Sequence, residues 1–310
     1  MNTSDTLAGS QLQADAAVSI PISPARLLYW SIRRELWENR SIYIAPLAVG
    51  AVALIGFMVS AIQLPAKMRA ALNLEPMQQH VAIGQHFVVV ALMLMFTEIV
   101  VAAFYSLDAL YGERRDRSLL FWKSLPVSDL TVVISKASIP ILVLPLVTFA
   151  ATVVAQLLML LVGSAVLAGS GMDASMLWTH VPFLKTSAIN LYHLVMFHGI
   201  WYAPFYAWLL LVSAWAKRTP LLWAAFPPVA IGLFEKFAFN TSYFANMLLN
   251  HFTGGAQSGS GEKATGMTME MMAGEHPGHI LISPGLWIGL ALTAAFLFAA
   301  ARLRRSRGVI

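Results

Sequence analysis

The chain has 310 residues, of which 58% are hydrophobic and only 11% are charged. Soluble domains carry about 25% charged residues, so this composition excludes an ordinary soluble protein and indicates a membrane protein. Cysteine is absent, which excludes disulfide bonds and thiolate-bound metal or redox centres. The net charge is +5, and the basic residues flank apolar runs as orientation signals do, so no nucleic-acid partner is expected.

The N-terminal region divides into a tail and an amphipathic segment. Residues 1–23 are polar, lack the apolar region of a signal peptide, and are predicted to be a disordered cytoplasmic tail. Residues 24–40 begin with a proline suited to a first helical turn. Four of them recur at three- and four-residue steps: Leu27, Trp30, Arg34 and Trp37. Trp and Arg beside a span favour an interfacial helix, with a plain cytosolic extension of the first span as the alternative.

Apolar runs predict an all-α integral membrane protein, because a helix needs about 20 apolar residues to cross the hydrocarbon. Residues 24–310 are expected to form one transmembrane domain. The six predicted spans are about 42–62, 84–107, 139–166, 188–214, 221–234 and 285–301. Two segments between them are long and polar, a loop at 108–136 and a loop at 235–284.

The fifth run is short for a crossing and contains Pro227 and Pro228, which we expect to break it. Residues 237–252, which follow it, are apolar enough to enter the outer leaflet. Irregular backbone at that depth must be covered by protein or water. The sequence leaves two interpretations open, a re-entrant segment or a slightly longer span followed by an interfacial helix.

The distribution of basic residues predicts the orientation. With six spans and both termini in the cytoplasm, the cytoplasmic segments contain fifteen of the twenty Lys and Arg residues. This excess agrees with the positive-inside rule. The loop at 108–136 is then cytoplasmic, and the loop at 235–284 is external.

The cytoplasmic loop has the pattern of a short helix held between two longer ones. Glu113 and Arg117 are spaced for an i,i+4 ion pair. Residues 119–125 are apolar and aromatic, and are predicted to form a helix capped by Ser118 and ended at Pro126. Ser128 is placed to cap the helix that follows. An ordinary cytoplasmic loop is the alternative, although Phe121 and Trp122 favour a docking surface.

The run ERRDRSLLFWKSLPVSD at 113–129 resembles the cytoplasmic loop of ABC transporter permeases of the type-2 exporter family. In that family this loop carries a coupling helix that docks on an ATP-binding subunit. The resemblance extends to an N-terminal interfacial helix, six spans and a long external segment. It implies that the following residues contact or position the ATPase: Glu113, Arg117, Ser118, Trp122, Lys123, Leu125 and Pro126.

The resemblance also implies the partners and the location. It predicts a separate ABC ATP-binding subunit, a second permease copy, whether identical or similar, and a bacterial plasma (inner) membrane as the site. The chain has no G-x-x-x-x-G-K-[ST] motif, so ATP would be bound by the partner and no cofactor by this chain. The alternative function is a non-transporting membrane protein, either a sensor subunit or an intramembrane enzyme.

Other candidate sites are isolated polar residues. Glu98 lies within the second span, where an ionised group is costly and a functional role is the default hypothesis. It could face the interior, pair across a dimer or bind a proton. His193 and His198 lack the spacing of a metalloprotease motif and are predicted to be satisfied histidines rather than metal ligands. Methionines and histidines cluster at 267–279 in the predicted external loop, and methionine thioethers can bind Cu(I). A flexible external loop with scattered methionines is the simpler interpretation of this segment.

Overall fold

The computed structural model describes residues 23–116, 127–252 and 281–306, and within these ranges every regular element is helical. Five of the helices are long and apolar enough to cross a membrane, and a bent pair raises the number to six if it counts as one span. An all-α protein with several membrane-spanning helices is therefore confirmed. The predicted helix at 119–125 lies outside the described residues.

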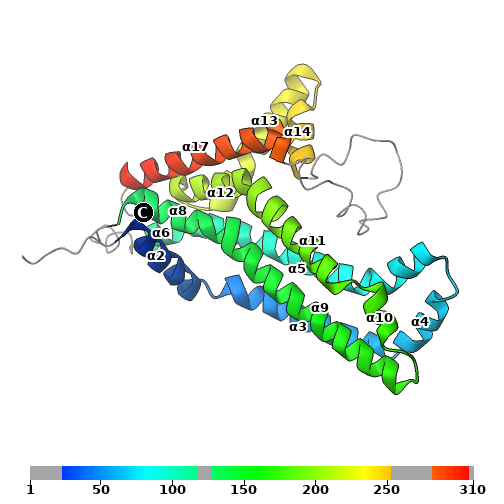
Figure 1. The fold of residues 1–310 in the computed structure, drawn as a ribbon. Helices are drawn as coiled ribbons and strands as arrows, with labels where there is room; N and C mark the ends of the chain where they lie inside the picture. The colour runs from blue at the N-terminus through cyan, green and yellow to red at the C-terminus, as the bar shows by residue number, and fades with distance from the viewer. Residues whose placement is uncertain (1–22, 117–126, 253–280, 307–310) are drawn as a thin grey trace, which may run out of the picture.

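The helices form an elongated bundle (Figure 1). One end carries α2, α6, α8 and the end of α17, and the other end carries α4 and α10. In chain order the helices are α2 (Pro24–Glu38), α3 (Ser41–Ala61), α4 (Leu64–Ala71), α5 (Pro76–Asp108), α6 (Tyr111–Arg115), α8 (Asp129–Ser138), η1 (Ile139–Val143), α9 (Leu144–Gly169), α10 (Ser175–His180), α11 (Phe183–His193), η2 (Leu194–Trp201), α12 (Ala203–Trp215), α13 (Pro220–Phe239), α14 (Tyr243–Phe252) and α17 (Pro284–Ser306).

The helix boundaries differ from the predicted spans mainly by extension. The second span is part of α5, which begins at Pro76, and the third begins within α8 at Asp129. Between the first two spans, Leu64–Ala71 is also helical, as α4. Hydropathy locates the apolar part of a helix, but the backbone continues in helical form until a cap or a proline ends it.

Serine residues cap the starts of α2 and α8. Ser23 precedes Pro24 and accepts a hydrogen bond from the Arg26 N–H at 3.3 Å. Ser128 accepts one from the Thr131 N–H at 3.1 Å, as its predicted capping role requires. Each hydroxyl satisfies a donor that the first helical turn leaves unpaired.

Among the described residues, four apolar clusters lie along the bundle, and two of them mark its two ends. The first joins α3, α5, α9 and α10 around Phe87, Met159 and Leu177. The second lies toward the end that carries α2, and joins α8, α12 and α17 around Val133, Leu210 and Ala300. Long helix α5 packs against helices of both groups, and therefore connects the two ends of the molecule.

Two π-helical segments, η1 and η2, pack against each other inside the bundle. Pro145 has no N–H for the carbonyl of Ile141, four residues earlier. That carbonyl faces Gly199 so closely that a Cβ at position 199 would overlap its oxygen. Pro140 lies within η1 and Pro145 in the first turn of α9, so the prolines of the third span accompany its π-helical segment. At its end η2 meets α12 in a bend of 45°.

Helix α13 is continuous from Pro220 to Phe239, so the predicted break at Pro227 and Pro228 is wrong. Proline at 228 leaves the carbonyl of Ala224 without its helical donor. The indole N–H of Trp208, on α12, donates to this carbonyl at 3.2 Å. A neighbouring helix therefore supplies the missing hydrogen bond, which is how transmembrane helices tolerate proline.

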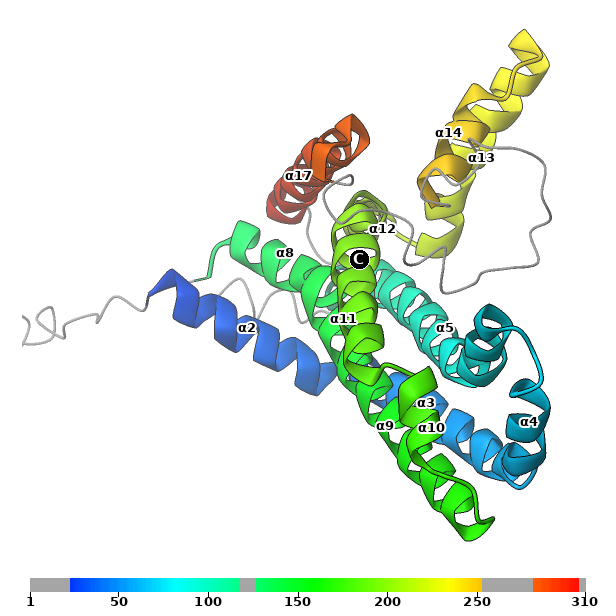
Figure 2. The ribbon, with the colours of Figure 1, turned by 45° about the vertical axis from the view of Figure 1, so that its right-hand side comes forward.

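Helix α14 folds back beside α13 and forms a hairpin that stands out from the bundle (Figure 2). The Glu235 carboxylate holds the turn by accepting hydrogen bonds from Thr241 Oγ1 and from the N–H groups of Tyr243 and Phe244 at 2.6–2.8 Å. The first part of the predicted loop at 235–284 is thus helical. The hairpin consists of two helices, and both the re-entrant segment and the longer span followed by an interfacial helix stay as interpretations of it.

Candidate functional site

The candidate site is a cluster of buried charges at the end of the bundle where the segment 117–126 begins and ends. Helix α6 leads into that segment and α8 follows it. Six charged residues form its centre, three basic and three acidic: Arg34, Glu35, Glu113, Asp129, Lys136 and Arg304. At the edge, the exposed Glu38 pairs with Arg34 at 2.7 Å. We call the six central residues the charge network.

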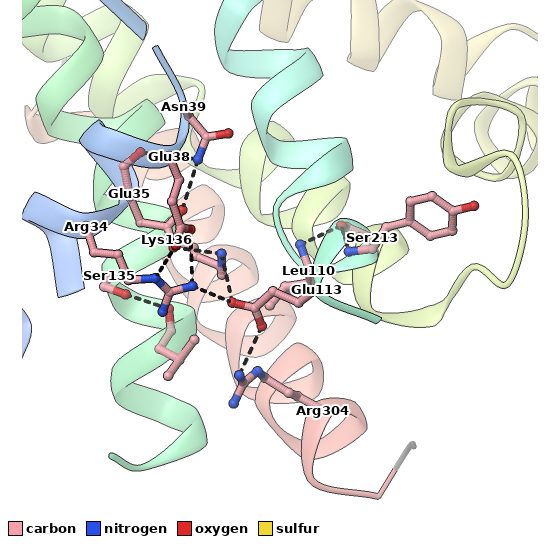
Figure 3. Close-up of polar contacts among 12 residues, drawn as sticks. Arg34, Glu35, Glu38, Asn39, Leu110, Glu113, Ser135, Lys136, Ser213 and Arg304 are labelled. Atoms are coloured by element: carbon pink, nitrogen blue, oxygen red, sulfur yellow. Dashed lines mark hydrogen bonds and ion pairs between the residues drawn. The ribbon is translucent and has the colours of Figure 1, made fainter. Parts of the chain in front are cut away.

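Lys136 is the centre of the charge network (Figure 3). Its side chain is 3% exposed, and its Nζ lies 2.8 Å from Glu35 Oε1 and 3.2 Å from Glu113 Oε1. A buried ammonium is tolerated only when it is paired and hydrogen-bonded. Two carboxylates from different helices, α2 and α6, meet this requirement together.

Glu113 connects Lys136 to the C-terminal helix. Its Oε2 accepts a hydrogen bond from Arg304 Nη2 at 3.0 Å, and its Oε1 lies 3.6 Å from Arg34 Nη2. Arg304 also donates to Asp129, at the start of α8, at 2.5 Å. The carboxylate of Glu113 is therefore held by basic residues of α2, α8 and α17.

Glu35 is buried at 2% exposure on the inner face of α2. In addition to Lys136, it accepts a hydrogen bond from the Tyr105 hydroxyl at 2.8 Å and lies 3.4 Å from the amide of Asn39. The opposite face of α2 exposes Trp30 and Trp37, with the guanidinium of Arg33 stacked over both rings. Helix α2 thus presents aromatic residues outward while its acidic residue fixes it to the bundle.

Arg114 and Ser213 attach the junction of α5 and α6 to α12. Arg114 Nη2 donates to the carbonyls of Ser213 and Ala216 at 2.6 and 2.7 Å. Cations are favourable at a helix C-terminus, where carbonyls lack helical partners. The Ser213 hydroxyl accepts from the N–H groups of Leu110 and Tyr111 at 3.0 and 2.9 Å, which otherwise would be unpaired at the start of α6.

The geometry gives this end of the molecule a specific mechanical property. Four helices that are distant in sequence are joined through buried ion pairs, and breaking a buried pair by removing one partner typically costs about 3–5 kcal/mol. These contacts tie the α6 and α8 ends that border segment 117–126 to α2 and α17, and Arg114 ties α6 to α12.

Of the residues predicted to serve ATPase coupling, the structure places only Glu113, whose side chain is 7% exposed within the charge network. The other six predicted positions lie outside the described residues: Arg117, Ser118, Trp122, Lys123, Leu125 and Pro126. The predicted pair of Glu113 with Arg117 also falls outside them, and the partners of Glu113 that the structure shows come from other helices.

Glu98 faces the interior of the chain rather than the lipid. It is 0% exposed on α5, and its Oε2 lies 3.3 Å from Nδ1 of His198 on η2. Among the residues that the structure describes, no group of three or more His, Asp and Glu side chains is arranged to hold a metal ion. The two histidines considered as ligands, His193 and His198, have different neighbours, since His193 stacks on Phe197 at 4.7 Å.

The sequence analysis did not identify Glu35, Lys136, Arg304 or Arg114 as site residues. Lys136 was counted as the end of a polar loop and Arg304 as part of a basic tail. A signal was present, because Glu35 lies between tryptophans and Lys136 borders an apolar run. Comparison of the chain with protein-family models, curated proteins and solved structures finds no match.

Proposed function

We propose that this chain is the membrane-spanning permease subunit of an ATP-driven exporter. A separate ATP-binding subunit docks on segment 117–126, and the charge network carries the resulting movement into the helices. The observation that supports this most is that Glu113 and Lys136, from the two sides of that segment, lie 3.2 Å apart and are tied to α2 and α17.

The resemblance of residues 113–129 to the coupling loop of type-2 ABC permeases supplies the identity of the partner. A docking segment transmits force only if its two ends are rigidly attached. The charge network, together with the bonds of Arg114 to the end of α12, provides such an attachment.

Further features of the proposal follow from the number of spans. Six spans are half of a translocation unit of this family, so a second permease copy completes it. The basic residues around the charge network suit the cytoplasmic side of a bacterial plasma membrane, with both termini inside.

The proposal is tested by co-expressing the tagged chain with each ABC ATPase of the same genome that lacks membrane spans of its own, and by purifying the chain in detergent. The wild-type chain is expected to retain one of these ATPases. The double variant Trp122→Asp/Leu125→Asp is expected to lose it, because charges replace the apolar face predicted to dock. Retention by the double variant, or no retention by the wild type, contradicts the proposal.

The role of the charge network is tested by Glu113→Gln, with Glu75→Gln as the control. Glu75 is exposed and makes no side-chain cap at the start of α5. We expect Glu113→Gln to keep the ATPase bound but to lose the change in ATP hydrolysis rate that the permease imposes on its partner. Equal hydrolysis rates in wild type, Glu113→Gln and the control refute the transmission role.

A further inference from the structure

Glu98 and His198 face each other in the interior of the helix bundle, far from the charge network along α5. Their nearest charged atoms are 3.3 Å apart, Glu98 is 0% exposed and His198 is 8% exposed. The pair lies where α5, η1, η2 and α12 pack together. Neither oxygen of Glu98 accepts a hydrogen bond from any residue in the described ranges.

The titratable groups around this pair carry no fixed charge that would balance it. Tyr206 on α12 is fully buried, and its hydroxyl has no hydrogen-bond partner among the described residues. The ring of Tyr202 lies 5.8 Å from that of His198, and His193 precedes η2. Segment η1 and the adjoining part of α9 present no acid or base, and no Lys, Arg or Asp within the described ranges forms an ion pair with Glu98.

Charge balance determines how many protons the pair contains. An isolated carboxylate or imidazolium in this environment carries a large desolvation cost, so the pair must be neutral overall. A carboxylate beside an imidazolium is neutral, and so is a carboxylic acid beside an imidazole. Both arrangements contain one proton.

We propose that Glu98 and His198 form an intramembrane proton-binding site that holds one proton while α5 and η2 are packed together and releases it when they separate into water. Glu and His side chains exposed separately at pH 7 hold about a quarter of a proton between them, because they titrate near about pH 4.3 and 6.5. Closing the site therefore takes up about three quarters of a proton at pH 7.

The backbone at this site suits a contact that opens and closes. His198 belongs to η2, and π-helical turns inside helices frequently mark functional sites. Gly199, the next residue, lets η2 approach the Ile141 carbonyl of η1. The inference concerns the chain alone and does not rest on the proposed ATPase partner.

The test measures the unfolding equilibrium of the purified chain in lipid bicelles by steric trapping, between about pH 5.5 and pH 8. Glu98→Gln leaves His198 neutral in the folded chain, with no proton to hold. The ratio of the wild-type folding constant to that of Glu98→Gln is therefore expected to fall about tenfold for each pH unit. Glu75→Gln, which changes an exposed acid, is expected to run parallel to wild type.

His198→Gln supplies a second, independent variant. Without the imidazole, Glu98 must carry the proton itself. Above about pH 7 the stability of this variant is expected to fall with rising pH in parallel with wild type. Between about pH 5.5 and 6.5 the stability of the variant is expected to depend on pH just as steeply, whereas that of wild type levels off toward about pH 5.5. Parallel pH curves for wild type and Glu98→Gln overturn the proposal. If Glu98→Gln does not fold, a pH-independent His198→Gln curve overturns it instead.

Discussion

Replacing Lys136 by methionine tests whether the charge network behaves as a balanced unit. Methionine keeps much of the volume of the lysine stem but removes the ammonium that lies 2.8 Å from Glu35 and 3.2 Å from Glu113. Glu113 retains Arg304 at 3.0 Å, whereas the remaining hydrogen-bond partners of the Glu35 carboxylate, the Tyr105 hydroxyl and the Asn39 amide, are neutral. The loss therefore falls mainly on Glu35.

The magnitude follows from this asymmetry. Leaving one buried charge without its partner typically costs about 3–5 kcal/mol, so Lys136→Met is expected to destabilise the chain by that amount. Adding Glu35→Gln removes the unbalanced carboxylate and should recover a large part of the loss. Adding Glu113→Gln instead should recover none, because Glu35 stays unbalanced and Arg304 loses one of its two acidic partners.

The assay is the unfolding equilibrium of purified variants in lipid bicelles at fixed pH and salt concentration. Lys185→Met, at an exposed position, is the matched control and is expected to change stability by less than about 0.5 kcal/mol. The reasoning is refuted if Lys136→Met costs no more than the control, or if Glu35→Gln and Glu113→Gln rescue it equally.

Two further outcomes are expected at the fifth span. Trp208→Phe removes the donor to the Ala224 carbonyl and should lower the free energy of unfolding by about 1–3 kcal/mol in the same assay. Pro228→Ala restores a helical N–H for that carbonyl, so Trp208→Phe should cost less when Pro228→Ala is also present. An equal cost of Trp208→Phe with Pro228 and with Ala at 228 contradicts the explanation. Burial lowers the pKa of His251, because the neutral imidazole is the form that packs against Trp201. The stabilisation of docked α14 by this contact is therefore fully present above about pH 6.5 and is lost as the pH falls through the lowered pKa. Amide exchange in α14, corrected for intrinsic rates, should therefore accelerate several-fold from pH 7.5 to 5.5 in wild type but not in His251→Phe, and equal acceleration in both would exclude His251 as the cause.

The spans were predictable because hydropathy is a local property: the long apolar runs are helical, although the run at 188–214 is divided among α11, η2 and α12 and bends by 45°. The same local reasoning misjudged α13. Whether a helix continues through Pro227 and Pro228 depends on a donor from another helix, and Trp208 lies 16 residues before the carbonyl that it serves. The π-helical turns have a similar origin, since they depend on how Ile141 and Gly199 meet.

The candidate site was harder to predict for a related reason. A charged residue next to a span has the same appearance in sequence whether it faces water or a buried partner. Lys136 and Glu35 are 101 residues apart, and nothing in either local pattern identifies the other. Glu113 was chosen through the resemblance of its loop, whereas Glu98 was found because acids inside spans are rare.

The position of Arg304 also constrains how the chain is made. Arg304 lies 191 residues after Glu113 and 175 after Asp129, so both acids emerge from the ribosome well before their shared guanidinium. At 5–20 residues per second this interval lasts about 10–40 s. During it the acids of the six-residue charge network outnumber its bases by one, and Arg304 supplies the missing base when helix α17 inserts. Chains that stop before α17 keep an unbalanced charge, which gives the cell a physical difference between finished and unfinished copies.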